Sequence, residues 1–175
     1  MKINFSRFRG SVRLSAASLL LAAAAAQPAF AATDTATMGV SATVTANCNV
    51  STTALSFGNV DVTSGSNVDG TSTIDVTCTN GTGWTATADA GAGTGATLTT
   101  RKMANGAELL NYVLYTDSAR TTIWGDGVGG TTATLTGTGT GSAQQSTIYG
   151  QVPSGQTSLP AGSYADTVTV TVTYS

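Results

Sequence analysis

Few side chains in this 175-residue chain are suited to chemistry. The chain has two cysteines and no histidine, so a hydrolytic triad and most zinc sites lack their usual parts. Asp117 and Asp126 flank Trp124 and resemble the carboxylate pair of a glycosidase, but acids beside glycine in turns are more often solvated turn residues. Nothing in the sequence shields or positions Lys102 as a base. We therefore expect no catalytic residues, no metal site and no cofactor.

Cys48 and Cys78 are predicted to form a disulfide, because the start of the chain predicts export to an oxidising compartment. Residues 1–13 carry four basic side chains and no acidic one, residues 14–26 are largely apolar, and Ala29-Phe30-Ala31 matches a signal-peptidase site. The apolar stretch is shorter than the roughly 20 residues that span a bilayer. We expect cleavage after Ala31 and no membrane insertion. A reactive or metal-binding cysteine pair is the alternative, without a histidine to support it.

The charge of the mature chain limits its partners. Residues 32–175 keep three basic and nine acidic side chains, a net charge of −6. Such a charge repels nucleic acid and anionic membrane surfaces, so we expect no nucleic-acid partner. The length suffices for one domain with its own core.

Residues 38–44, Met-Gly-Val-Ser-Ala-Thr-Val, alternate between apolar and small or polar side chains. This period predicts a strand with one buried face. No glycine or proline between Val44 and Val50 would turn it back on the strand that follows. Its partner could lie in another molecule; the alternative is a long first strand that switches sheets within one sandwich.

The rest of the mature chain is rich in threonine and valine, has frequent glycine-rich turns, and shows no helical spacing of apolar residues. It predicts an all-β sandwich. We expect strands at residues 55–62, 74–78, 84–88, 110–115, 146–152 and 168–174. We expect glycine-rich loops at residues 89–95, 125–130 and 136–141.

The aromatic side chains have two interpretations. They could form a sugar-binding platform, but in a sandwich such residues more often fill the core or its rim. The residues concerned are Trp84, Tyr112, Tyr115, Trp124, Tyr149, Tyr164 and Tyr174.

Three groups of residues together resemble the spore coat protein U domain family. The likeness covers Val40 to Ser175, and the order and spacing of its pieces are more specific than any one piece. Its opening is Cys48-Asn49-Val50, Leu55-Ser56-Phe57-Gly58 and Val76-Thr77-Cys78; its middle is Leu110 to Asp117 with Trp124-Gly125-Asp126-Gly127; its end is Pro160 to Tyr174. The family includes subunits of archaic chaperone–usher pili of the Csu type.

The resemblance implies an incomplete immunoglobulin-like sandwich whose missing strand leaves a groove. A periplasmic chaperone would fill the groove first, and the N-terminal extension of the next subunit would replace it at the outer-membrane usher. Residues 1–31 would be the signal peptide, 32–46 the donor extension and 47–175 the sandwich. The donor side chains would be Met38, Val40, Ala42 and Val44. The C-terminal strand bordering the groove would contribute Val168, Val170, Val172 and Tyr174.

The resemblance therefore favours a structural pilus subunit that reaches the cell surface through the periplasm and serves adhesion and biofilm formation. Its partners would be copies of itself or other pilus subunits, the chaperone and the usher. The alternatives are a spore-coat or other secreted surface protein of the same fold, or a carbohydrate-binding adhesin module. The sequence does not distinguish a major from a minor subunit.

Overall fold

The computed structural model describes residues 30–175, so almost all of the predicted signal peptide lies outside the described residues. The chain divides into two units, the first ending at Ser41 and the second beginning at Ala42. Residues 30–41 contain no helix or strand, and their side chains are exposed. The alternating segment 38–44, predicted as a strand, is therefore not one in this chain alone.

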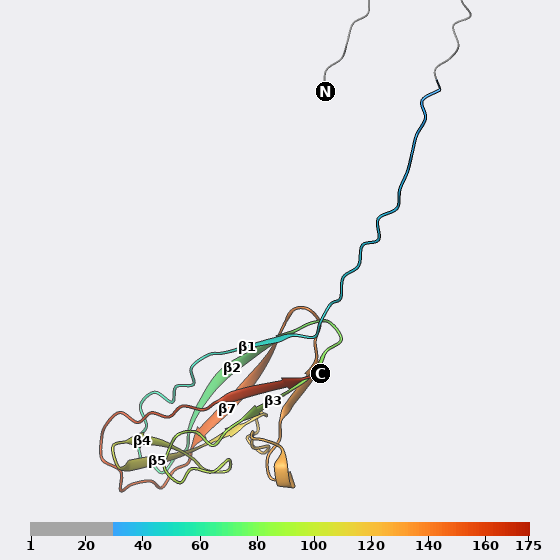
Figure 1. The fold of residues 1–175 in the computed structure, drawn as a ribbon. Helices are drawn as coiled ribbons and strands as arrows, with labels where there is room; N and C mark the ends of the chain where they lie inside the picture. Colours follow the sequence, from blue (N-terminus) through green and yellow to red (C-terminus); the bar gives the residue numbers. More distant parts are fainter. Residues whose placement is uncertain (1–29) are drawn as a thin grey trace, which may run out of the picture. The chain divides into compact units, whose positions relative to one another are not determined.

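The second unit is built from two antiparallel sheets (Figure 1). Five strands form the larger sheet in the order β1 (Cys48–Thr52), β2 (Val68–Cys78), β7 (Ala143–Val152), β5 (Glu108–Tyr115) and β4 (Arg101–Asn105). Three strands form the smaller sheet in the order β6 (Leu135–Thr138), β3 (Gly83–Ala88) and β8 (Val170–Tyr174). The helical structure in the described part is one short 3₁₀ turn, Val128–Gly130. The all-β sandwich predicted from the sequence is confirmed.

The core lies between the two sheets and follows the alternation of the strands. Ile74, Val76 and Cys78 of β2 all face inward and are at most 2% exposed, as their spacing predicts. The other buried apolar residues come mainly from β3, β5 and β7: Trp84, Ala86, Ala88, Leu110, Tyr112, Leu114, Trp124, Ile148 and Val152.

Three further elements differ from the expectations. Residues 55–62 were predicted as a strand but form none: Leu55 and Phe57 are out of phase with Val60 and Val62, and Gly58 between them has a positive φ of 63°. Residues 136–141 were predicted as a loop, yet the threonines and glycine at their start belong to β6. Strand β4 was not predicted, because its sequence Arg-Lys-Met-Ala-Asn has only two apolar residues to show a period.

A disulfide joins Cys48 at the start of β1 to Cys78 at the end of β2, and the two residues are directly paired in the ladder. It fixes the edge strand β1 to the rest of the larger sheet. By the usual chain-entropy estimate, closing a loop of this length stabilises a fold by roughly 3–4 kcal/mol.

Candidate functional site

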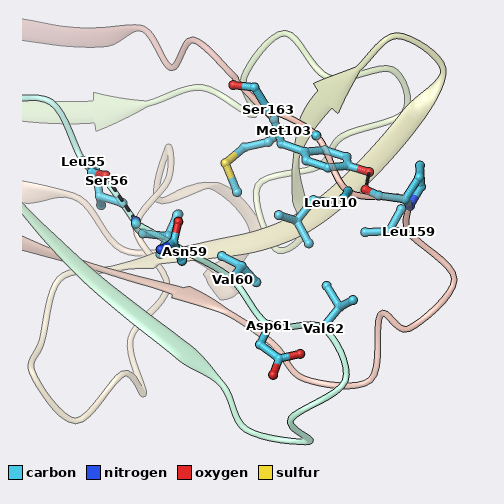
Figure 2. Close-up of a pocket in the computed structure, with 16 residues that line it drawn as sticks. Leu55, Ser56, Asn59, Val60, Asp61, Val62, Met103, Leu110, Leu159 and Ser163 are labelled. Atoms are coloured by element: carbon cyan, nitrogen blue, oxygen red, sulfur yellow. Dashed lines mark hydrogen bonds between the residues drawn. The ribbon is translucent and has the colours of Figure 1, made fainter.

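The candidate site is a groove over the inner face of the larger sheet. Two adjoining cavities of about 780 and 430 Å³ make it up, and both are lined by Leu55, Phe57, Met103 and Tyr164. Residues 52–62 form one wall, and residues 159–170 form the other. The floor is mainly apolar core: Ile74, Leu110, Tyr112, Leu114, Trp124 and Ile148. Figure 2 shows Val60 and Val62 facing Leu110 and Leu159 across the larger cavity.

Strands β1 and β8 are the last strands of their sheets, so each has a free edge. In Figure 1, β8 is the dark red arrow that ends at the C-terminus. Thr169 accepts a hydrogen bond from Asp89 N (3.1 Å), and Ser175 N donates to Gly83 O (3.3 Å). Since antiparallel strands alternate the direction of their backbone groups, Val170 and Val172 direct theirs away from β3. This edge can therefore hydrogen-bond another strand.

The four C-terminal residues expected at the groove differ in their surroundings. Val168, Val170 and Val172 are partly buried and pack against the core, although Val168 precedes β8. Tyr174 is 41% exposed. Its phenol lies 3.4 Å from Asn47 Oδ1, at the end of β8. Val168 and Val170 line the smaller cavity, while Tyr174 does not.

Hydrogen bonds to carboxylate side chains fix the wall formed by residues 159–170. Asp166 accepts hydrogen bonds from Tyr112 Oη (2.6 Å) and from the backbone N–H groups of Ala92 (2.7 Å) and Thr167 (2.8 Å). Burial, and then the hydrogen bond to Asp166, raise the pKa of Tyr112 well above its usual value, so this tyrosine stays a neutral donor. The wall is therefore linked to the larger sheet and to the loop after β3.

A second carboxylate, Asp89, fixes the C-terminal part of this wall, because it accepts a hydrogen bond from the backbone N–H of Thr169 at 2.9 Å. Partial burial raises the pKa of Asp89, but the Thr169 and Gly91 N–H groups and the charge of Arg101 outweigh it, so its pKa lies below the usual value. Backbone hydrogen bonds between Ala104 and Ala165 add an attachment to β4. The start of β8 is thus fixed from both sheets.

Arg101 stabilises the loops next to this wall. Its sequence context gave no sign of this role. It is fully buried, and its guanidinium donates to the carbonyl oxygens of Asp89 (2.9 Å), Leu98 (3.0 Å) and Trp124 (2.9 Å). Its partners are loop carbonyls far apart in sequence, so no motif could reveal the role. A buried charge satisfied in this way orders the loops around it.

The opposite wall is held mainly by packing. Leu55 and Phe57 lie over Gly70 and Gly150, which are paired on β2 and β7 and would bring a Cβ within 3.2 Å of these side chains. Phe57 also contacts Tyr112 edge-on, with ring centroids 6.0 Å apart. Between residues 54 and 60 the hydrogen bonds described are local to the segment. The backbone of residues 54–60 is therefore not hydrogen-bonded to another strand of the described chain.

The side chains expected to form the donor strand are exposed in the part of the chain that the structure describes. Met38 and Val40 are each 86% exposed and Val44 is 84% exposed, and Ala42 is exposed as well. An exposed row of apolar side chains on an extended segment fits a role in binding, since soluble chains seldom leave such rows uncovered.

The acids considered for catalysis have structural roles in turns. Asp117 accepts hydrogen bonds from the backbone N–H groups of Thr121 and Thr122. Asp126 accepts from Val128 N (2.9 Å) and from the hydroxyl of Thr132 (3.1 Å). Among residues 30–175, no three His, Cys, Asp or Glu side chains are grouped to hold a metal ion.

Three of the aromatic residues considered for a sugar platform are core residues. Trp84, Tyr112 and Trp124 are at most 6% exposed, so they offer no ring face to a ligand. Tyr115, Tyr149 and Tyr164 are partly buried. In the described part of the chain, no helix has the length and apolar character needed to cross a membrane.

The fold and the groove together define an immunoglobulin-like sandwich with room for an additional strand. The chain belongs to the Spore Coat Protein U domain family, whose sequence model matches residues 34–171. The family and the fold are structural rather than catalytic.

Known proteins similar to this chain include a curated protein and a solved pilus-subunit chain. "Protein U" of Myxococcus xanthus is 40% identical over 85 residues, which cover 47% of this chain and 45% of that protein. A solved chain from the CsuC–CsuE chaperone–tip adhesion subunit pre-assembly complex of the archaic chaperone-usher Csu pili of Acinetobacter baumannii matches with a TM-score of 0.53 and 21% identity. That match covers 74% of this chain and 40% of the other. This chain thus spans less than half of each, and the second likeness shows the fold alone.

Proposed function

We propose that this protein is a structural subunit of an archaic chaperone–usher pilus and that it polymerises by donating residues 38–44 to the groove of a second copy. One observation carries the proposal: an apolar groove with a free strand edge and an exposed, alternating apolar segment occur in the same chain. The alternating side chains of the segment suit a groove that buries one face of a strand. The free edge beside the groove can hydrogen-bond the backbone of the segment, which has no strand partner in its own chain.

The energetics favour this pairing. Burying Met38, Val40 and Val44 contributes roughly 5–9 kcal/mol in all, with a small addition from Ala42. Ladder hydrogen bonds to Val170 and Val172 add about 0.5–1.5 kcal/mol each. Ordering the extended segment opposes both contributions. Long-lived fibres would therefore depend on slow unfolding of the completed sandwich.

The open groove also explains the need for a chaperone. A free edge beside exposed core is a template for aggregation, so a periplasmic chaperone would occupy it until the usher joins the subunits. One solved chain of similar fold comes from a chaperone–subunit complex, which supports this part of the proposal. Export through the periplasm to the cell surface, and a role of the fibres in adhesion and biofilm formation, belong to the same proposal.

The test uses two changes in the donor segment. Deleting residues 33–45 removes it, and Val40→Asp places a carboxylate in an apolar groove at a loss of several kcal/mol. Both variants should co-purify with the chaperone at normal yield and form no fibres by electron microscopy. Ser41→Asp is the matched control: it adds the same charge on the opposite face of the alternating segment, and fibres should persist. Loss of the chaperone complex in the Val40 variant would contradict the proposal.

The family match favours a second candidate, a coat or other secreted surface protein that uses the same fold. A chaperone and an usher encoded beside this chain, and their co-purification with it, would favour the pilus. Their absence, with the protein recovered from a surface coat, would favour the second candidate.

A further inference from the structure

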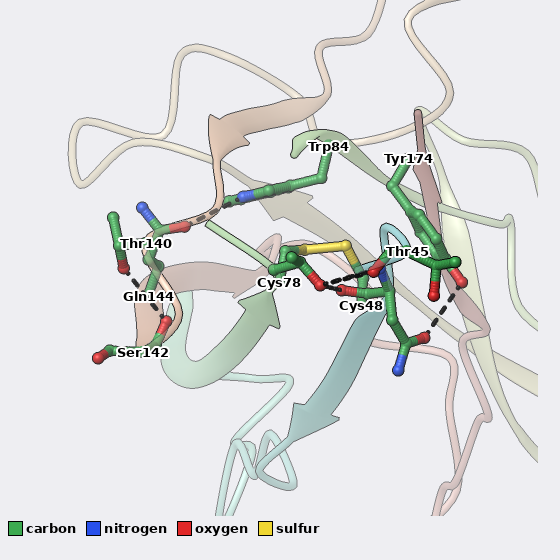
Figure 3. The surroundings of a disulfide bond; sticks show 10 residues. Thr45, Cys48, Cys78, Trp84, Thr140, Ser142, Gln144 and Tyr174 are labelled. Carbon is green, nitrogen blue, oxygen red and sulfur yellow. Dashed lines mark hydrogen bonds between the residues drawn. A yellow bond between two sulfur atoms is a disulfide. The ribbon is translucent and has the colours of Figure 1, made fainter. Parts of the chain in front are cut away.

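The root of the extension, defined as residues Thr45–Asn47, is held by one side chain. The hydroxyl of Thr79, just after β2, accepts a hydrogen bond from Asn47 N (3.1 Å). The same hydroxyl lies 3.3 Å from the carbonyl oxygens of Thr45 and Asn47, to either of which it can donate. The hydrogen bonds around the root are drawn as dashed lines in Figure 3. One threonine therefore contacts both ends of the root.

The root also contacts the smaller sheet, through β8. Asn47 receives the hydrogen bond from the Tyr174 phenol at the end of β8. Asn47 thus lies between the end of β2 and the end of β8, where the two free edges come together. The groove lies further along the same two strands: its lining starts at Thr52, the last residue of β1, and at Val170, the first residue of β8. The root is therefore separated from the groove by the length of these strands.

The root continues the line of β1. Cys48 pairs with Cys78, and one step further out Thr79 N donates to Asn47 O at 2.9 Å, as in a continued antiparallel ladder. To enter its own groove, the segment before the root would have to reverse direction within residues 45–47. These residues contain neither glycine nor proline, and tight hairpin turns favour glycine or asparagine at positive φ. The one asparagine of the root, Asn47, is not at positive φ and is already paired with Thr79. The hydrogen bonds of Thr79 oppose that reversal.

Self-insertion would also give the weaker pairing. A segment folded back beside β1 would run antiparallel to β1, in the direction from Val170 to Tyr174 along β8. It would therefore lie parallel to β8, and parallel ladders are slightly less stable per residue than antiparallel ones. A segment supplied by another molecule has no such constraint.

We propose that Thr79 is a positioning residue that holds the root in line with β1 and so directs residues 38–44 into the groove of a second copy rather than its own. The inference rests on the proposed function, because it assumes that the groove accepts this segment. By this inference, the hydrogen bonds of Thr79 disfavour insertion of the segment into its own groove, which would give a closed monomer, and favour binding to a second copy, which gives a fibre.

The test measures where the segment binds. Val40→Cys in the segment and Val170→Cys in the groove wall are introduced together in the full chain, and the thiols are joined with a short bifunctional reagent. On a non-reducing gel, linkage between molecules gives a ladder and linkage within one molecule gives a shifted monomer. Adding Thr79→Val should raise the ratio of internal to intermolecular product about threefold to tenfold, the range expected for one or two net hydrogen bonds.

Two further variants calibrate the ratio. Thr77→Val, on the same face of β2 but with no hydrogen bond from its hydroxyl to any described residue, should leave it unchanged. Replacing Thr45 and Ala46 by Asn and Gly supplies a hairpin turn and should give the highest internal yield. An unchanged ratio in the Thr79 variant, with a normal ladder, would overturn this inference and leave the proposed function intact. No linkage between the two cysteines in any variant would overturn both.

Discussion

At the scale of single residues, this fold depends on a few polar side chains placed among apolar ones. Arg101 is the one charged side chain fully buried in the described part of the chain, and each of its guanidinium nitrogens has a carbonyl partner. Arg120 differs: its side chain is partly exposed and forms an ion pair of 3.2 Å with the half-exposed Asp69, besides long hydrogen bonds to the carbonyl oxygens of Gly150 (3.4 Å) and Ser118 (3.3 Å). The two arginines therefore test what burial adds to a charged group.

Arg101→Met keeps the length of the side chain and removes its hydrogen bonds to three carbonyls; the bond to Trp124 O is buried, and those to Asp89 O and Leu98 O are partly buried. Since an unsatisfied buried polar group destabilises by about 1–3 kcal/mol, the free energy of unfolding should fall by at least that amount. Arg120→Met should lower it by about 1 kcal/mol or less, because its ion-pair partner Asp69 is half-exposed. Urea unfolding of the two variants measures the difference, and equal losses would contradict the role assigned to Arg101.

At the scale of elements, the sequence predicted strands well where burial and pairing coincide. Residues 74–78 and 84–88 alternate, face the core and lie between two neighbouring strands. Residues 55–62 also contact the core, yet they form no strand, and their apolar positions change phase between Phe57 and Val60. The apolar residues of a segment indicate which side chains are buried; they do not indicate whether a second backbone lies beside the segment.

The same limit explains how much of the site could be predicted. The period of the C-terminal valines predicted one buried face, and Val168, Val170 and Val172 do pack against the core; their place beside a groove was implied by the family resemblance alone. The tie between Asp166 and Tyr112 and the contact of Thr79 with the root were not foreseen. Both join residues that are remote in sequence, and neither follows a local pattern.

The packed wall should be sensitive to the two glycines beneath it. A Cβ at residue 150 would lie 2.8 Å from Leu55 Cδ1 and 2.9 Å from Phe57 Cζ, so Gly150→Ala should push both side chains out of place. Overpacking of this kind destabilises by about 1–3 kcal/mol. Gly83→Ala is the control, since a Cβ there meets nothing within 4 Å. Thermal unfolding should separate the two variants, and an unshifted transition for Gly150→Ala would show that the wall yields freely.

At the scale of the whole sandwich, the two walls of the groove differ in how they are held. Asp89 and Asp166 fix the C-terminal wall through hydrogen bonds to both sheets. The wall at residues 52–62 rests chiefly on the packing of Leu55 and Phe57. One wall is therefore preorganised to receive a strand, while the other can adjust to the side chains that arrive.

This asymmetry predicts that a free donor segment stabilises the sandwich. A peptide spanning residues 33–46 should raise the unfolding temperature of a chain whose own segment is blocked by Val40→Asp. Since the peptide binds only the folded chain, the gain should grow with peptide concentration and reach about 2.7 kcal/mol at one hundred times the dissociation constant. The same peptide carrying Val40→Asp has equal length and lacks the central apolar contact, so it should have little effect. Equal stabilisation by both peptides would mean that the groove does not recognise the alternating side chains.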